Sequence, residues 1–292
     1  MIRIKCILVV TLLLNKVYAI DLNKPVGGRS VAMGRTSVCE RGIWALQNNP
    51  AGLALTKEWG FGAYYENQWM LKATAFKYGG IAKGIPKVGC IGLSCCQFGG
   101  ASYSENQFGL CYARDFGSYL QLGLRADYLL LHWGEGYSNQ GAFSFTLGLQ
   151  SQVTEKLQLG ACLFNPIHSR LGTLNKDALP IVMRLGIAYQ FTEDFVGQCE
   201  LGYNSSRAGF SLHGGLEYLV FKQFYLRAGV QSNPNILSFG LSYQLGPIQV
   251  EVSAEMHQAM GASMGVGMKW KTENGKRKTE NANRVTEIRV LR

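Results

Sequence analysis

Apolar and polar residues alternate along most of this 292-residue chain. Between Tyr119 and His132 an apolar residue recurs at every second position, with Gln121, Arg125 and Asp127 set between. Successive side chains of a strand point to opposite faces, whereas helical spacing would not collect these residues on one side. The stretch therefore predicts a strand with one apolar and one polar face.

The same alternation returns from about residue 56 onward and predicts about fourteen strands, each bounded by turn residues. They are expected at residues 56–66, 69–83, 86–98, 106–114, 118–133, 140–152, 156–164, 180–191, 195–204, 208–220, 223–231, 235–245, 247–256 and 261–271. Lengths of about ten residues suit tilted strands that cross a bilayer.

The connections between these strands alternate in length. Those after even-numbered strands are short, as at 153–156, 192–195, 221–223 and 245–247. Those after odd-numbered strands are mostly longer and polar, as at 99–106, 134–141 and 165–179. This alternation is typical of outer-membrane barrels, which have periplasmic turns on one rim and extracellular loops on the other.

The predicted fold is therefore all-β: a transmembrane, up-and-down antiparallel β-barrel of about 14 strands, apolar outside and polar inside. A soluble sandwich would need connections that cross between sheets, and a lipocalin-like cup has about eight strands. Aromatic residues near the strand ends are expected to form girdles at the lipid headgroups; they are Tyr64, Tyr65, Trp69, Trp133, Tyr189, Phe191, Tyr203, Tyr218, Tyr243 and Trp270.

Residues 1–19 have the features of a cleaved signal peptide. Arg3 and Lys5 precede an apolar stretch over residues 6–14, and small residues ending at Ala19 form a cleavage site. Such a leader indicates export, and together with the barrel it predicts the bacterial outer membrane, with lipid as a partner. No Cys stands at the cleavage point, which argues against a lipoprotein anchor.

The formal net charge of +10 is concentrated at the chain ends. The leader carries three Lys or Arg, and residues 271–292 carry seven against three Glu, so +3 is left for residues 20–270. Nucleic-acid binding would need basic residues gathered on one surface, so we expect no nucleic-acid partner.

Seven of the eight Cys residues remain after leader removal, an odd number that does not suggest a disulfide scaffold. Most lie within predicted strands, without the paired spacing of zinc ligands. We interpret them as small strand residues and expect no metal site and no cofactor. A bridge between Cys96 and Cys111, on neighbouring strands, stays open.

Residues 20–55 do not alternate. They contain the sequences GGRSVAMG, from Gly27 to Gly34, and LQNNPAGLA, from Leu46 to Ala54. Glycines permit tight turns, and Pro50 ends any helix begun near Trp44. We expect this segment to act as a hatch or plug within the lumen.

These two motifs resemble those of the PorV/PorQ family of outer-membrane proteins from Bacteroidetes, relatives of the FadL-type fatty-acid transporters. The residues that carry the resemblance are Gly27, Gly28, Arg29, Met33, Gly34, Asn49, Pro50, Ala51 and Gly52. It implies a FadL-like barrel of fourteen strands with an N-terminal segment in its lumen. It also implies a non-enzymatic role in type IX secretion, as a partner of the translocon and a carrier of cargo.

The chain departs from that family in two ways: its loops are short, and it continues beyond the aromatic residue Trp270, where such barrels usually stop. The domains are therefore predicted as a signal peptide (1–19), a hatch or plug (20–55), a barrel (56–271) and a basic tail (272–292). We expect the tail to be disordered, with a periplasmic contact as the alternative.

Catalytic motifs are absent from the sequence, which has no G-x-S-x-G and no H-E-x-x-H. The four His residues, at 132, 168, 213 and 257, are scattered, and His213 and His257 fall on the polar face. We therefore predict no catalytic residues and a pore-lining role for these two, although a lipase that uses Ser and His on the lipid face stays conceivable.

Charged residues on the predicted inner face are of both signs. They are expected to pair across the lumen, because unpaired buried charges are costly; a polar conduit is the alternative. The set is Arg125, Asp127, Arg184, Glu217, Arg227, Glu251, Glu255 and Lys269.

Two functions compete. The first is an accessory component of an outer-membrane or secretion complex, which the motifs and the basic tail favour. The second is a FadL-like passive transporter of a hydrophobic small molecule. It ranks lower because the inner faces look polar and glycine-rich, and because only the loop 165–179 is long enough to shape a pocket.

Overall fold

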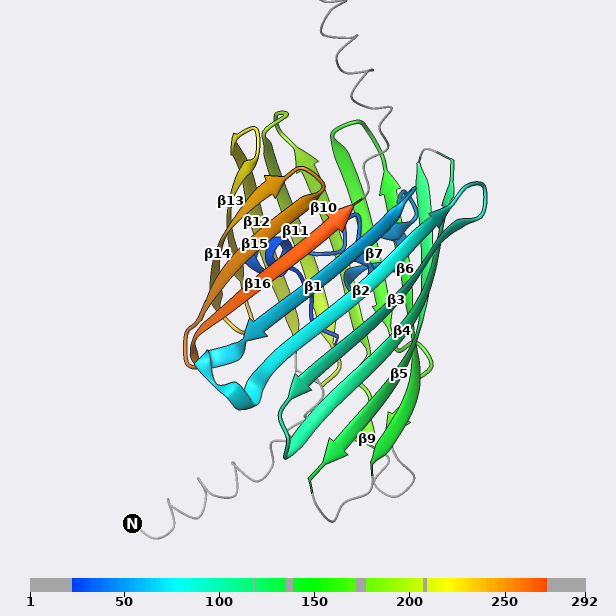
Figure 1. Cartoon of the computed structure of the whole chain (residues 1–292), viewed down its shortest axis with the longest axis vertical. Coiled ribbons are helices and arrows are strands. Elements are labelled where there is room, and N and C mark those ends of the chain that lie inside the picture. The colour runs from blue at the N-terminus through cyan, green and yellow to red at the C-terminus, as the bar shows by residue number, and fades with distance from the viewer. Residues whose placement is uncertain (1–22, 118, 135–138, 172–176, 207–208, 272–292) are drawn as a thin grey trace, which may run out of the picture.

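The computed structural model describes residues 23–117, 119–134, 139–171, 177–206 and 209–271. The predicted leader and the basic tail 272–292 lie outside the described residues. Fourteen antiparallel strands form a closed barrel (Figure 1), which confirms the predicted fold. They are β1 Trp59–Asn67, β2 Ala75–Ile85, β3 Gly89–Gly99, β4 Tyr103–Phe116, β5 Leu120–Trp133, β6 Gln140–Gln152, β7 Leu157–Phe164, β10 Val182–Gln190, β11 Phe195–Asn204, β12 Phe210–Phe221, β13 Phe224–Gln231, β14 Ile236–Leu245, β15 Ile248–His257 and β16 Gly261–Lys271.

Each barrel strand pairs with its neighbours in sequence, so the topology is up-and-down. The ring closes where β1 pairs antiparallel with β16, with Tyr64 opposite Gly267. Closure leaves no sheet edge with unpaired backbone groups, which is what a barrel in lipid requires.

The two ends of the barrel differ. We call the end that carries Trp59 and Lys271 the chain-end rim; its turns are short, as at residues 86–88 and 246–247. We call the opposite end the loop rim; it carries the longest connection, residues 165–181. Two short strands in that connection, β8 (Arg170–Leu171) and β9 (Asp177–Ala178), pair with each other.

The structure corrects the predicted start of the second strand. Residues 69–74 are not strand: two 3-10 turns, η2 (Gln68–Met70) and η3 (Lys72–Thr74), precede β2. Trp69 and Met70 have φ values of 52° and 57°. This left-handed backbone cannot continue a pleated ladder.

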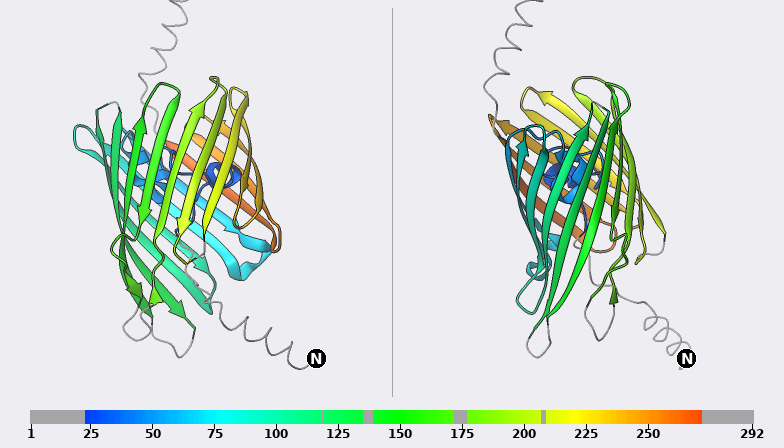
Figure 2. Two further views of the ribbon diagram at one scale, coloured as in Figure 1. Left: turned by 180° about the vertical axis from the view of Figure 1, so that it is seen from behind. Right: turned by 90° about the vertical axis from the view of Figure 1, so that its right-hand side faces the viewer.

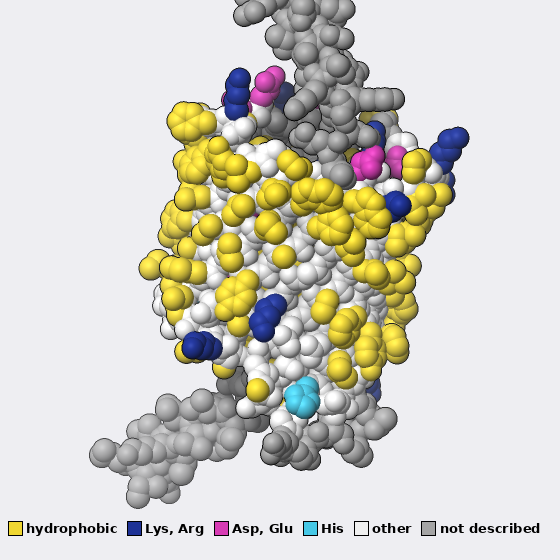
Figure 3. Space-filling model, viewed as in Figure 1, with side chains coloured by type: hydrophobic (Ala, Val, Ile, Leu, Met, Phe, Trp, Pro, Cys, Tyr) yellow, Lys and Arg dark blue, Asp and Glu magenta, His cyan; other side chains and the backbone are white. Residues whose placement is uncertain are grey.

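Large apolar side chains cover the outside of the barrel. Figure 3 shows them spread over the strands on the face in view, with charged side chains along the upper rim and Lys or Arg side chains also on the lower half. On β14, Leu237, Phe239, Leu241 and Tyr243 are all exposed. An outer surface on which large apolar side chains predominate in this way suits contact with lipid rather than with water.

Most of the predicted girdle residues lie on this outer surface, including Tyr65, Trp133, Tyr189 and Tyr203. Tyr64 is a correction, because it is only 3% exposed and packs inside the barrel against Trp44. A second correction is Trp69, which lies in the 3-10 turn η2 and lines an internal cavity.

The segment before β1 lies inside the ring of strands, as the blue ribbon in Figures 1 and 2 shows. It contains the short helices α2 (Gly28–Ala32) and α3 (Ala45–Asn48) and the 3-10 turn η1 (Pro50–Leu53). Nearly all residues from 24 to 54 are buried. We call residues 23–55 the plug. No helix among the described residues is long and apolar enough to cross a membrane.

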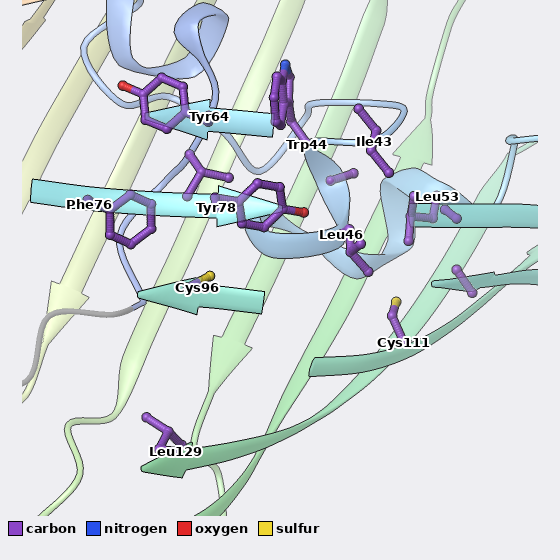
Figure 4. Packing of buried hydrophobic residues seen from close by; sticks show 14 of the residues in the cluster. Ile43, Trp44, Leu46, Leu53, Tyr64, Phe76, Tyr78, Cys96, Cys111 and Leu129 are labelled. Atoms are coloured by element: carbon purple, nitrogen blue, oxygen red, sulfur yellow. The ribbon is translucent and has the colours of Figure 1, made fainter. Parts of the chain in front are cut away.

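The plug shares an apolar core with the wall (Figure 4). Trp44 lies between Tyr64 and Tyr78, with ring centroids 6.3 and 5.8 Å away, and Leu46 packs in the same cluster. The cluster extends along the inner wall to Leu129. Its wall residues are inward-facing apolar side chains, so the inner face is not only polar and glycine-rich, as expected, but also carries an apolar patch.

The described Cys residues are all free thiols. Cys96 and Cys111 are buried on adjacent strands, but the register places Gln107 opposite Cys96 and Gly92 opposite Cys111. The bridge left open by the sequence is therefore not formed in the structure.

Candidate functional site

The first motif, Gly27 to Gly34, places α2 against β14 and β15. Gly27 and Gly34 have φ values of 97° and 68°, a region that favours glycine. A Cβ on Gly28 would lie 2.6 Å from the Cβ of Glu251. Met33 is fully buried against the wall. In this structure the motif forms a docking surface for the plug.

The second motif, Asn49 to Gly52, turns the chain back toward the wall. The Asn49 Oδ1 accepts a hydrogen bond from the amide of Ala51, while its Nδ2 donates to the Val38 carbonyl at 2.6 Å. Pro50 then opens η1. A Cβ on Gly52 would lie 2.1 Å from the Glu40 carbonyl oxygen, so only glycine fits there.

The predicted inner-face charges all lie in the lumen, where several of them hold the plug. Arg29 of the plug donates to Glu217 at 2.9 Å, and Arg227 on the next strand donates to the same carboxylate at 2.5 Å. One wall carboxylate thus joins the plug to two strands.

Glu251 makes a second junction. Its Oε2 accepts from the Arg29 amide and from the Trp44 indole, each at 3.1 Å. Lys269 lies 3.1 Å from its other oxygen. This carboxylate therefore fixes both short helical segments of the plug.

Arg125, fully buried on β5, pairs with Asp127 at 2.8 Å. Its guanidinium also donates to the carbonyl oxygens of Leu46 and Gln47, each at 2.8 Å. These carbonyls belong to the end of α3, so a cation there also suits the helix dipole.

Several charged partners were missed by the sequence analysis. Glu66 on β1 accepts from Lys24 at 3.2 Å and from Arg35 at 2.9 Å. Arg35 also forms a bidentate pair with Glu255, with one contact at 2.8 Å. The alternation in β1 could have placed Glu66 inward, but the plug cations have no periodic pattern that would reveal them.

Glu40 is buried in the plug with one oxygen bound to Asn48 at 2.7 Å, and its Oε1 has no hydrogen-bond partner among the described residues. Burial raises the pKa of Glu40 to about 7, although the positive charges of Arg29 and Lys269 lower it in part. The plug thus contains a carboxyl group that titrates near neutral pH.

A cavity of about 500 Å³ lies between the plug and the loop rim. Charged and polar side chains, among them Arg35, Glu66 and Glu255, line one part of it, and apolar side chains line another. The apolar part includes Leu129, Phe164, Val182, Ile236 and Met260. This size and mixed lining are typical of a small-molecule site.

The two inward His residues both line this cavity. The His213 Nδ1 lies 2.8 Å from the carbonyl oxygen of Gly34, and its Nε2 lies 2.9 Å from the Ser211 hydroxyl. Across the described ranges, no group of three or more His, Cys, Asp or Glu side chains is arranged to hold a metal ion.

No family model matches the chain, and no curated protein matches it. Solved structures do. The Ralstonia pickettii toluene transporter TbuX is 14% identical, with a TM-score of 0.62, and the match covers 86% of this chain and 99% of that one.

Two further matches agree in fold. A deletion mutant of the TodX monoaromatic hydrocarbon channel is 13% identical, with a TM-score of 0.67, covering 87% of this chain and all of the other. A Pseudomonas aeruginosa FadL homologue is 13% identical, with a TM-score of 0.58, covering 86% and 98%. The chain therefore has a FadL-like barrel fold.

Proposed function

We propose that this protein is an outer-membrane channel that takes up hydrophobic small molecules. The closed barrel with its apolar outer surface supports a place in a bilayer. The structures of similar fold are described as toluene transporters and monoaromatic hydrocarbon channels, not as enzymes. Transport is therefore ranked above the accessory role in a secretion complex, whereas the sequence motifs favoured the accessory role.

The observation that carries the proposal is the cavity at the loop rim. It offers apolar side chains such as Phe164 and Val182, which the supposedly polar inner face was expected to lack. A ligand entering from the loop rim would meet this cavity first and the plug behind it.

The plug argues against a permanently open pore. Trp44, Ala51 and Leu53 are fully buried within the lumen, between the cavity and the chain-end rim. Passage of a ligand through the lumen therefore requires the plug to rearrange, and binding in the cavity would come first.

The accessory role in type IX secretion stays a prediction, since it depends on the PorV/PorQ-like motifs. In this structure those motif residues dock the plug, which is a sufficient reason for their presence. Affinity purification from detergent-solubilised membranes tests this role: co-purifying secretion components would support it, and recovery of the barrel alone would count against it.

The transport proposal is tested by filling the cavity. Val182 lines it near the loop rim, so Val182→Trp should obstruct it. Leu185 on the same strand is exposed on the outer surface, and Leu185→Trp is the matched control. In cells that make each variant, we would measure the uptake rate of a hydrophobic fluorophore across the outer membrane.

We expect wild type and the Leu185 variant to accelerate uptake. The uptake rate through the Val182 variant should be at least about tenfold lower than through wild type, which corresponds to about 1.4 kcal/mol. Equal uptake by both tryptophan variants would show that the cavity is not on the uptake pathway. No acceleration by wild type would end the proposal.

A further inference from the structure

The charged groups around the cavity neutralise one another. Lys24 and Arg35 face the carboxylates of Glu66 and Glu255. Arg184, also in the lining, is 3.9 Å from Glu200 and donates to Ser37 and to the Asn48 carbonyl.

Lys24 and Arg35 are thus paired with carboxylates of the lining. Arg184, whose Nε has no hydrogen-bond partner among the described residues, lies 3.9 Å from Glu200, which is outside the lining. A ligand carboxylate that enters the cavity would lose its hydration. The cations there already lie beside carboxylates and would not compensate for that loss, so binding of a carboxylate is unfavourable.

The uncharged polar groups of the lining are less well satisfied. Gln231 Oε1 and both amide atoms of Asn23 are buried and have no hydrogen-bond partner among the described residues. Both residues belong to the lining of the cavity. Buried polar atoms without partners are rare in native proteins, and a bound ligand is one way to satisfy them.

Ser211 adds a further acceptor. The Gly34 carbonyl can only accept, so the proton of a neutral His213 ring lies on Nδ1. The unprotonated Nε2 then accepts from the Ser211 hydroxyl, whose oxygen keeps its lone pairs for another donor. Gln231 lies directly opposite His213 on the next strand, so these acceptors lie close together.

We propose that the cavity selects an uncharged amphipath whose polar end donates a hydrogen bond, in the chemical class of phenols and alcohols. The apolar body would lie against side chains such as Phe164 and Ile236, and its hydroxyl would meet the acceptors around Gln231. This inference rests on the proposed function and narrows its ligand.

The physical basis is the cost of leaving those acceptors empty. A site built to hydrogen-bond a hydroxyl rejects an analogue without one, because its buried polar groups then stay unpaired. A hydrocarbon of the same shape would therefore bind more weakly, and so would an ether that can accept but not donate.

The test uses four compounds of similar shape: p-cresol, 4-methylanisole, toluene and 4-methylbenzoate. Their binding to the full chain in lipid nanodiscs is measured by calorimetry at neutral pH, with empty nanodiscs subtracted. We expect p-cresol to bind at least about tenfold more tightly than each of the others. A fifth compound, 4-methylbenzylamine, tests whether the acceptors prefer a cation.

Variants locate the effect. Gln231→Met removes the acceptor Oε1 at nearly constant side-chain volume. It should weaken the binding of p-cresol by about tenfold and leave the binding of toluene unchanged. Gln121→Met is the matched control, since Gln121 Oε1 is also buried and lacks a hydrogen-bond partner within the described part of the chain, but Gln121 does not line the cavity. Ser211→Ala is a second variant that keeps the inference testable if the first fails to fold.

Each outcome decides something. Equal binding of all compounds would leave the transport proposal standing and overturn the selectivity. Tightest binding of the benzoate or the amine would also overturn it, as would equal losses in the Gln231 and Gln121 variants. No binding by any compound would remove both proposals.

Discussion

The lumen has two regions whose inward-facing residues differ in kind. Toward the plug, the wall presents glycines on which the plug backbone rests. A Cβ on Gly229 would lie 2.0 Å from the Gly34 amide nitrogen, and one on Gly123 would lie 2.3 Å from the Pro50 carbonyl carbon. Toward the loop rim, side chains such as Phe164 and Val182 border open space instead.

The difference shows how one barrel can hold a plug firmly and still offer a site beside it. Backbone contact over glycine and buried ion pairs leave no room for a ligand on the plug side. On the cavity side, about 500 Å³ lies beside the plug, and atoms of Asn23 and Gln231 have no hydrogen-bond partner among the described residues. Substitutions on the plug side should therefore change stability, while those in the cavity should change binding.

The largest expected effect comes from Glu217→Gln. Two arginines, the partly buried Arg29 and the buried Arg227, share this carboxylate, and its loss leaves both without their anion. Breaking a buried pair in this way costs about 3–5 kcal/mol. The denaturant midpoint of the detergent-solubilised protein, followed by tryptophan fluorescence, should fall accordingly.

Glu193 is the matched control for that variant, since it lies in an exposed turn. Glu193→Gln should shift the midpoint by no more than about 0.5 kcal/mol. A Glu217 variant as stable as this control would mean that the ion pairs do not anchor the plug.

Gly229→Val should have the next largest effect. The added side chain would meet the backbone of Gly34 rather than a flexible side-chain end. We expect a loss of about 3 kcal/mol, the upper part of the usual cost of overpacking. Hydrogen exchange of the amides in α2 should accelerate, while the strands on the far side of the barrel stay protected.

Gly79→Val is the control for this substitution, because Gly79 is exposed on the outer surface and a Cβ there would meet nothing within 4 Å. Unchanged exchange of α2 in the Gly229 variant would show that the plug does not rest on these glycines.

These contacts also show how far sequence patterns reach in this molecule. The strands were predictable because a half-apolar sheet imposes a period of two, and their number and order followed from it. The plug has no such period, so its partners were not predictable: Arg29 and Glu217 are 188 residues apart, and only the closed barrel brings them together.

The side chain of Tyr64 illustrates the same limit. Tyr64 and Tyr65 are adjacent in the sequence, so in a strand they point to opposite faces, and the sequence alone does not say which of them faces lipid. Glu66, which is 1% exposed, shares the face of Tyr64 and reveals it as the inner one. Alternation separates two faces, but it does not show which side chains of the inner face are apolar because the apolar plug packs against them, as Trp44 does against Tyr78.

The smallest expected effect is a pH dependence from Glu40. Its pKa rises from 4.5 to about 7 in the folded protein because the carboxyl is buried in the plug. The folded state therefore binds more protons than the unfolded state between these values, and stability falls as pH rises through this window. At 1.36 kcal/mol per pKa unit the ceiling is about 3 kcal/mol, and relaxation around the ionised group should reduce it to about 1–2 kcal/mol.

Glu40→Gln removes the titrating group and keeps an oxygen that can accept from Asn48, as Glu40 does now. Relative to wild type, this variant should gain about 1–2 kcal/mol between pH 4.5 and pH 8, with nearly all of the gain complete by about pH 7. Denaturant midpoints at the two pH values measure it. A stability difference between the two proteins that stays constant with pH would show that Glu40 keeps an ordinary pKa, and that the plug does not respond to pH through this residue.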